Sequence, residues 1–182
     1  MKNAFEDAVT PPVSEAEQLL IDEEVPYRRQ ADGSLLALGN LHIASQGLTR
    51  LPDLSRVIVR GGFTCAYNKL TSLEGAPKYV AGYFSCYDNQ LTTLKGAPEA
   101  VGGNFSCTGN QLKDLEDAPR TFKRLLSDFG RFNSWDDVPE DLRTSAETKA
   151  RWERERQFEQ ELSDMPVLKE PLNVGKPLQL KR

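Results

Sequence analysis

Three cysteines recur at a fixed spacing in the middle of the chain. Cys65, Cys86 and Cys107 are 21 residues apart, and each stands three residues before an asparagine. Thiols can bind a metal ion, form a disulfide or act as nucleophiles. A structural zinc site needs four ligands in a tetrahedron, which three thiols in one straight column do not supply. No cation that would lower a thiol pKa lies among the Phe and Leu around them, so we expect small buried core residues.

The chain offers little else for catalysis. It holds one histidine, His42, and no acid or cysteine repeats in a position that could face it. The acidic pairs Glu116-Asp117 and Asp136-Asp137 lie in predicted turns, where such residues cap or solvate the chain. No glycine-rich loop opens a helix, as a phosphate site would require. We therefore expect no enzyme activity, no cofactor, no metal ion and no small-molecule substrate.

The cysteines belong to a repeated segment. Residues 63–70, 84–91 and 105–112 read FTCAYNKL, FSCYDNQL and FSCTGNQL, and the following halves read LTSLEGAPKYV, LTTLKGAPEAV and LKDLEDAPRTF. Residues 41–48, LHIASQGL, fit the same pattern at a spacing of 22, and a degenerate fifth repeat starts at Leu126-Ser127-Asp128. About four repeats and a degenerate fifth indicate a solenoid.

Each repeat predicts one short strand followed by an irregular return. In F-x-C the apolar residues alternate, so Phe and Cys face the same side of a strand. The two leucines of Leu-x-x-Leu are expected to point into the core again. The Gly-Ala-Pro that follows excludes a helix or a central strand at that place. Twenty-one residues cannot bury their own apolar face, so successive repeats must stack. Their strands should lie parallel and in register, about 4.7–4.9 Å apart.

The pattern L/F-x-C/I/L-x-x-N-x-L resembles the leucine-rich repeat, in the short, asparagine-bearing form of bacterial and mobile-element proteins. The resemblance covers about residues 35–143, and residues 121–143 are similar to the closing segment of plasmid- and phage-type arrays. The chain departs from the common pattern in its Phe and Cys, and in Gln46 where the first Asn would stand. The implied fold is a leucine-rich-repeat solenoid with one short parallel β-strand per turn, a mostly irregular convex side, an N-terminal helix and hairpin cap, and a C-terminal α-helix.

The resemblance also implies roles within each repeat. Asn68, Asn89 and Asn110 would form a ladder in which each amide bonds the backbone of the adjacent repeat. The chain bends there and leaves buried N–H and C=O groups that need partners. In leucine-rich repeats the strand face is the usual site of protein recognition, so the outward strand positions are candidates for binding.

The outward positions form two columns of mostly small, neutral residues edged by aromatics. Tyrosine offers a large contact area at low entropic cost and is enriched at interfaces. The alternative is that small residues only allow the strands to curve. The first column holds His42, Thr64, Ser85, Ser106 and Ser127, the second Ala44, Ala66, Tyr87, Thr108 and Phe129, and the flank Asn40, Gly62, Tyr83, Asn104 and Leu125. The candidate partner-binding residues are Tyr83, Ser85, Tyr87, Asp88, Thr64, Tyr67, Ser106, Thr108, His42 and, from the C-terminal helix, Trp152.

The flanks predict further elements. Ser14 followed by Glu17 is a capping-box signature and predicts a helix near residues 15–23. Residues 27–38 predict a hairpin around Asp32-Gly33. Helix and hairpin would cover the first repeat, which would otherwise expose core to water.

The C-terminal flank is more polar. Phe132 and Trp135 are expected to plug the last repeat. Residues 139 to about 164 predict a helix with a thin apolar stripe, either solvated and held by i,i+4 pairs or in contact with a partner. The final PVLKEPLNVGKPLQLKR is either disordered or a linear docking peptide. The expected organisation is a flexible acidic arm (1–13), an N-terminal cap (14–40), the solenoid (41–135), a helical segment (136–165) and an extended basic tail (166–182).

Composition and charge limit the possible partners and the cellular location of the protein. The net charge is −4, and residues 1–24 hold seven acids against one lysine, hence −6. No basic block of the kind that binds nucleic acid is present, and no apolar run approaches the roughly 18 residues of a membrane span. MKNAFEDAVTPP lacks the apolar centre of a secretory signal. Three cysteines without scaffold spacing indicate free thiols, so we expect a cytoplasmic protein, in its cell of origin or in a host cell, with no membrane partner.

These features favour a non-catalytic protein–protein interaction module. The hypothesis is a mobile-element-encoded binder or inhibitor that occupies a surface of a host protein or complex, for example a defence complex. One alternative is a structural spacer or assembly component of a larger particle. Another is a nucleic-acid mimic or binder that uses the acidic arm or the basic tail. The expected partner is another protein, and homo-oligomerisation stays an open alternative.

Overall fold

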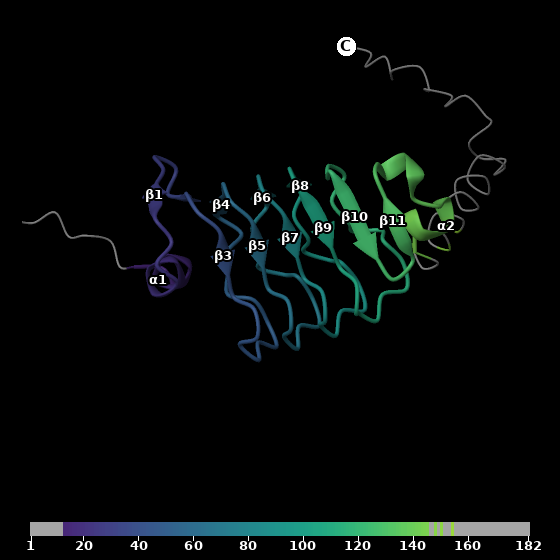
Figure 1. The fold of residues 1–182 in the computed structure, drawn as a ribbon, viewed down its shortest axis with the longest axis horizontal. Helices are drawn as coiled ribbons and strands as arrows, with labels where there is room; N and C mark the ends of the chain where they lie inside the picture. The colour runs from purple at the N-terminus through teal and green to yellow at the C-terminus, as the bar shows by residue number, and fades with distance from the viewer. Residues whose placement is uncertain (1–12, 146–147, 149, 151–153, 155–182) are drawn as a thin grey trace, which may run out of the picture. The chain divides into compact units, whose positions relative to one another are not determined.

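The computed structural model describes residues 13–145, 148, 150 and 154 of the chain. The chain divides into two compact parts, Met1–Thr144 and Ser145–Arg182. The first part contains a solenoid of about four coils, where one coil is one repeat of the sequence. Figure 1 shows the coils side by side, with the strands of successive coils running in the same direction.

Each coil contributes strands to two parallel sheets. The sequence predicts only one strand per repeat, because the additional strands are two or three residues long and too short for a visible alternation. Sheet 1 contains β2 (Leu35–Ala37), β4 (Val57–Val59), β6 (Tyr79–Val80) and β8 (Ala100–Val101), with β1 (Tyr27–Arg29) antiparallel at its edge. Sheet 2 contains β3 (Leu41–His42), β5 (Phe63–Thr64), β7 (Phe84–Ser85), β9 (Asn104–Ser106) and β10 (Arg124–Ser127), with β11 (Gly130–Phe132) antiparallel at its edge.

Glycines form the corner between the two sheets. The Gly82 amide donates to the Gly61 carbonyl at 2.9 Å, and the Gly103 amide donates to the Gly82 carbonyl at 2.8 Å. A Cβ on Gly82 would lie 2.6 Å from the Gly61 carbonyl carbon. The backbones of successive coils therefore approach more closely at this corner than a side chain allows.

The core confirms the expected register. Phe63 pairs with Phe84, and Phe84 pairs with Phe105, across parallel strands. Their rings stack at centroid distances of 5.1 and 5.3 Å. The leucines of the Leu-x-x-Leu segments fill the other side of each coil. The largest fully buried side chains are Phe63, Phe84, Phe105, Leu20, Leu41, Ile43, Leu54, Leu70, Leu73, Leu91, Leu94 and Leu115.

Gly-Ala-Pro closes the irregular half of the coil. Gly75 and Gly96 have φ values of +90° and +86°, which L-residues with a side chain rarely adopt. A Cβ on Gly75 would also lie 2.7 Å from the Pro52 carbonyl oxygen of the preceding coil. The alanine amides of the motif donate to the preceding Leu73 and Leu94 carbonyls at 2.9 and 2.8 Å and complete the turn.

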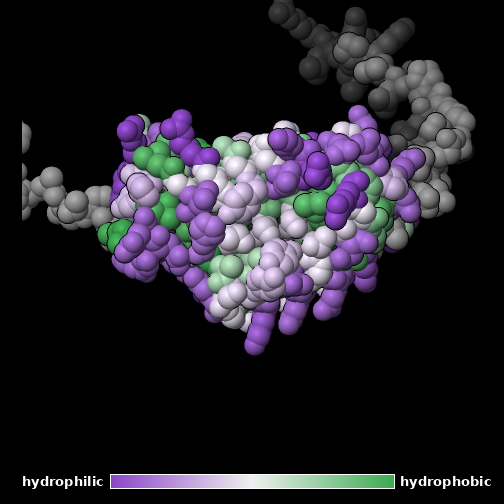
Figure 2. Space-filling model, viewed as in Figure 1, coloured by the Kyte–Doolittle hydropathy of each residue, from purple (hydrophilic) through white to green (hydrophobic). Residues whose placement is uncertain are grey.

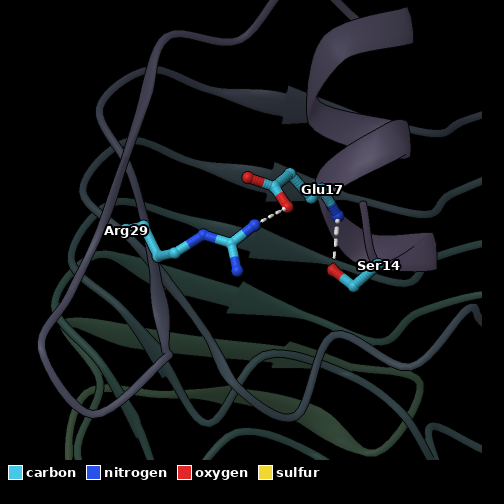
Figure 3. A network of polar contacts seen from close by, with 3 residues as sticks. All are labelled: Ser14, Glu17 and Arg29. Carbon is cyan, nitrogen blue, oxygen red and sulfur yellow. Dashed lines mark hydrogen bonds and ion pairs between the residues drawn. The ribbon is translucent and has the colours of Figure 1, made fainter. Parts of the chain in front are cut away.

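The N-terminal helix and hairpin are present. Helix α1 (Glu15–Asp22) begins after Ser14, whose hydroxyl accepts a hydrogen bond from the Glu17 amide at 3.1 Å. The Glu17 carboxylate does not return to the cap. It is buried and accepts a hydrogen bond from Arg29 on β1 instead, as Figure 3 shows. This ion pair joins the helix to the hairpin.

The fifth coil corrects the predicted register. Leu125 pairs with Phe105, and Leu126 pairs with Ser106, so the spacing here is 20 residues instead of 21. Leu125 and Ser127 consequently point inward and are buried, whereas Leu126 takes the outward place. The predictions that placed Leu125 on the outward flank and Ser127 in the outward column were therefore wrong. The buried Ser127 hydroxyl is accommodated because it donates to the Gly130 carbonyl at 3.2 Å.

Short elements follow the last coil. Phe132 is buried, and Trp135 is half-buried against the same core. A 3-10 helix, η1 (Trp135–Asp137), is capped by Ser134, and α2 (Glu140–Arg143) follows it. Most of the predicted helix up to about residue 164, residues 1–12 of the arm and the whole basic tail lie outside the described residues.

Candidate functional site

The cysteine column faces the core. Each sulfur is fully buried and lies 3.4–3.6 Å from a carbonyl oxygen of the next coil, with Cys65 opposite Ser85, Cys86 opposite Ser106 and Cys107 opposite Leu126. Burial raises the pKa of Cys65 and Cys86 far above the usual range and that of Cys107 to about 12. A protonated, inaccessible thiol is a poor nucleophile and a poor metal ligand. Within the described residues, no group of three or more His, Cys, Asp or Glu could hold a metal ion.

The asparagine ladder lies beside the cysteines. The Asn89 side-chain amide donates to the Cys65 and Cys86 carbonyls, each at 3.1 Å, and its oxygen accepts from the Leu70 amide at 3.0 Å. Asn68 and Asn110 make the corresponding contacts in the adjacent coils. These side chains connect successive coils where the chain leaves the strand, so they serve the scaffold and not the surface.

The predicted outward positions come together on sheet 2. Register pairs His42 with Thr64, Thr64 with Ser85, and Ser85 with Ser106. The strands lie across the middle of the array in Figure 1, where the surface in Figure 2 is mostly pale, with hydrophilic side chains along its margins. We call this surface the strand face; it comprises His42, Thr64, Ser85, Ser106, Tyr87 and Thr108, with Tyr67, Tyr83 and Asp88 beside them.

Tyr67 and Tyr87 form a pair on the strand face. Their ring centroids are 4.5 Å apart, with the planes at 73°, so the edge of one ring meets the face of the other. Tyr67 is 53% exposed. A hydrogen bond with Tyr67, and secondarily burial and the charge of Asp88, raise the pKa of Tyr87 to about 12. The Tyr87 phenol is therefore neutral at physiological pH.

Tyr67 and Asp88 share an unusual backbone conformation. Their φ values are +55° and +52°, and the same place is taken by Ser45 in the preceding coil and by Gly109 in the following one. Sequence reasoning selected these side chains for their chemistry and missed the conformation. Gly109 at the matching position was the signal that could have revealed it.

Tyr83 lies over the neighbouring coil. A Cβ on Gly62 would come too close to the Tyr83 ring for both to keep their places. The ring therefore occupies the space that glycine leaves free, and it remains 39% exposed. This places a third tyrosine at the start of the strands of sheet 2, at the opposite end from Tyr67 and Tyr87. The remaining predicted residue, Trp152, lies outside the described residues.

A groove between α1 and the first coil was not anticipated. It has a volume of about 560 Å³. Acidic and apolar side chains line it together, and the sequence pattern indicated only scaffold roles for them, in the helix and in the first repeat. Its walls are Glu15, Gln18, Leu19 and Asp22 from the helix and Ile43, Gln46, Gly47, Leu48, Thr49, Arg50, Leu51 and Pro52 from the coil.

The geometry defines a class, a parallel-strand solenoid with few helices. No family model, no curated protein and no solved structure matches the chain. Among the helices that the structure describes, none is long and apolar enough to cross a membrane.

Proposed function

We propose that the chain is a non-catalytic protein-binding module of the leucine-rich-repeat type, whose strand face occupies the surface of another protein. The observation that carries the proposal is the Tyr67–Tyr87 pair, with Tyr83 exposed at the other end of β7, on a face of small, neutral side chains. Tyrosines on a rigid scaffold give contact area without a large loss of side-chain entropy. The buried thiols, which leave the scaffold without a nucleophile among the cysteines, also support a binding role.

The repeat type within this proposal rests on the ladder and the spacing. Asn68, Asn89 and Asn110 bond adjacent coils as the resemblance implies. In the same proposal α1 and the β1–β2 hairpin cap the array, because Leu20 and Val25 extend its buried core beyond the first coil. A mobile-element origin, and a target in a host complex such as a defence complex, complete the proposal.

The test is affinity purification of the full chain from its natural host cell, followed by mass spectrometry. The Tyr83→Ala/Tyr87→Ala double variant should lose at least one protein that the wild type retains. Tyr79→Ala is the matched control, because Tyr79 is a 47% exposed tyrosine on sheet 1. Circular dichroism must show that both variants keep the wild-type fold.

Equal recovery of every protein by wild type and double variant would overturn the strand-face proposal and favour a spacer or assembly role. Loss with Tyr79→Ala instead would move the interface to sheet 1. Steeply salt-dependent retention of DNA would favour a nucleic-acid partner.

A further inference from the structure

We propose that Tyr67, Tyr87 and Asp88 form a seat for a cationic side chain, arginine above all, presented by a protein partner. The inference rests on the proposed function, because it assigns a chemistry to the partner of the strand face. It is carried by three features of these residues: the ring pair, an uncompensated carboxylate, and side chains at a left-handed backbone position where the next coil has glycine.

The ring pair supplies the aromatic wall. The two rings meet edge to face at 4.5 Å, and more than half of the Tyr67 surface is exposed. A guanidinium or ammonium group is attracted to the face of such a ring. The chain itself contains this type of contact, since the Arg120 guanidinium carbon lies 3.9 Å from the ring centroid of Trp135.

Asp88 supplies the negative charge. It is exposed and takes part in none of the ion pairs that the described residues form, which are Arg29–Glu17, Lys78–Glu99 and Lys95–Glu74. Lys69, two residues after Tyr67 in the preceding coil, makes no ion pair with it. The nearby Asp128 is engaged differently, because it accepts from the amides of Gly109 and Asn110 at 3.0 and 3.3 Å.

The strand face offers no cation of its own beside this carboxylate. Apart from Asp88 and the single histidine, the residues that define this face are Thr, Ser and Tyr. The face therefore carries an excess of negative charge at Asp88, and it is complementary to a basic side chain rather than to an acidic one.

The backbone indicates that these side chains are not there for the fold. Tyr67 and Asp88 both adopt a left-handed conformation, which is unfavourable for most residues with a side chain and is tolerated better by aspartate than by tyrosine. Gly109 fills the matching place in the next coil without that cost. Residues in an unfavourable backbone conformation often mark functional positions, particularly where glycine would meet the needs of the fold.

Arginine fits the seat better than lysine. Its planar guanidinium stacks on aromatic rings and donates to a carboxylate in fixed directions, whereas a lysine ammonium is a compact, strongly hydrated charge. One guanidinium could thus stack on a tyrosine ring and donate to Asp88.

The test is a titration of the full chain with N-acetyl-argininamide, followed through the aromatic NMR signals of Tyr67 and Tyr87. N-acetyl-citrullinamide, a neutral molecule of nearly the same shape, is the control probe. We expect concentration-dependent shifts at both tyrosines with the arginine probe, much smaller shifts with citrulline, and a decrease of the effect at high salt. Asp88→Asn should reduce the initial slope about two- to fivefold, the range of one exposed ion pair.

A second variant distinguishes a role of Tyr67 in binding from a role in stabilising the fold. Tyr67→Gly places the residue type of position 109 in the same backbone conformation, so the melting temperature should be at least that of Tyr67→Ala. The Tyr67→Gly variant should nevertheless lose the response of Tyr87 to the arginine probe.

Absent shifts, equal shifts with citrulline, or an unchanged slope in Asp88→Asn would each overturn the inference. Shifts that follow protein concentration without any probe would do the same, because a second copy of the chain would then occupy the face. These failures are distinct from failure of the proposed function. A partner that is lost with Tyr83→Ala/Tyr87→Ala in the purification would still stand, but its contact would not be cationic.

Discussion

At the scale of single residues, the cysteines and asparagines of the repeat stabilise the fold, although both types can also serve in active sites. The cysteines lie inward, and their thiols contact carbonyl oxygens of the next coil. The asparagine side chains are hydrogen-bonded to the backbone of their own coil and of the adjacent coil. The exposed tyrosines and Asp88 of the strand face, by contrast, follow no repeat-wide pattern.

The cysteines should be unreactive in the native protein. Because burial holds their thiols protonated, alkylation by iodoacetamide should proceed no faster than the protein opens. Mass spectrometry after a short pulse should find all three cysteines unmodified in native buffer and all three modified in denaturant. Rapid labelling of Cys86 in the native state would contradict its burial.

Asn89→Ala should be strongly destabilising. The substitution leaves the Leu70 amide and the Cys65 and Cys86 carbonyls without this partner, which we expect to cost about 3 kcal/mol. The free energy of unfolding from urea denaturation measures it. Asn104→Ala is the matched control, because Asn104 is exposed at the start of β9 and should change stability by less than about 0.5 kcal/mol. Equal effects of the two substitutions would refute the ladder.

At the scale of elements, the corner between the sheets decides how closely coils stack. The strands are only two to four residues long, so few ladder hydrogen bonds hold each pair. The glycine corner adds a further hydrogen bond per coil at the point where the chain changes from sheet 1 to sheet 2. Its short contacts make the corner more sensitive to substitution than the strands.

Gly82→Ala should therefore destabilise the protein. The new Cβ would lie 2.6 Å from backbone atoms of Gly61, and relief requires the coils to separate, at an expected cost of more than about 2 kcal/mol. Gly39→Ala is the matched control from the first coil, since a Cβ there meets only Val25 and Pro26 at 3.8 and 3.9 Å. Melting temperatures of the two variants provide the comparison. A Gly82→Ala protein as stable as Gly39→Ala would show that the corner is not tightly packed.

At the scale of the whole molecule, one buried cluster continues from Ala16 in α1 to Val138 after the last coil. Each coil contacts mainly its neighbours, as in other solenoids. The phenylalanine stack and the asparagine ladder nevertheless run through successive coils without interruption. A continuous core of this size should unfold as one unit.

Unfolding in urea should thus follow a single transition. In a Trp152→Phe variant the fluorescence reports Trp135 at the end of the array, whereas far-ultraviolet circular dichroism reports all coils. The two curves should coincide, and Asn89→Ala in the central coils should shift both to the same extent. A fluorescence transition that precedes the dichroism transition would show instead that the last coil unfolds independently.

The sequence by itself determined the spacing of the coils, the inward direction of Phe and Cys, and the helix and hairpin before the array. These follow from period and polarity, because a residue that repeats every 21 positions must meet its own equivalents when coils stack. The same rule failed in the fifth repeat. One residue is missing there, and the loss of one residue reverses every side chain of a strand.

Only the tertiary structure decided the second sheet, the glycine corner and the left-handed positions of Tyr67 and Asp88. Strands of two or three residues have no clear pattern of their own and exist because the adjacent coil supplies their hydrogen bonds. The Tyr67–Tyr87 pair likewise depends on coils that are distant in sequence and adjacent in space. Periodicity states which residues recur, but contact between coils sets the distance and direction in which their side chains meet.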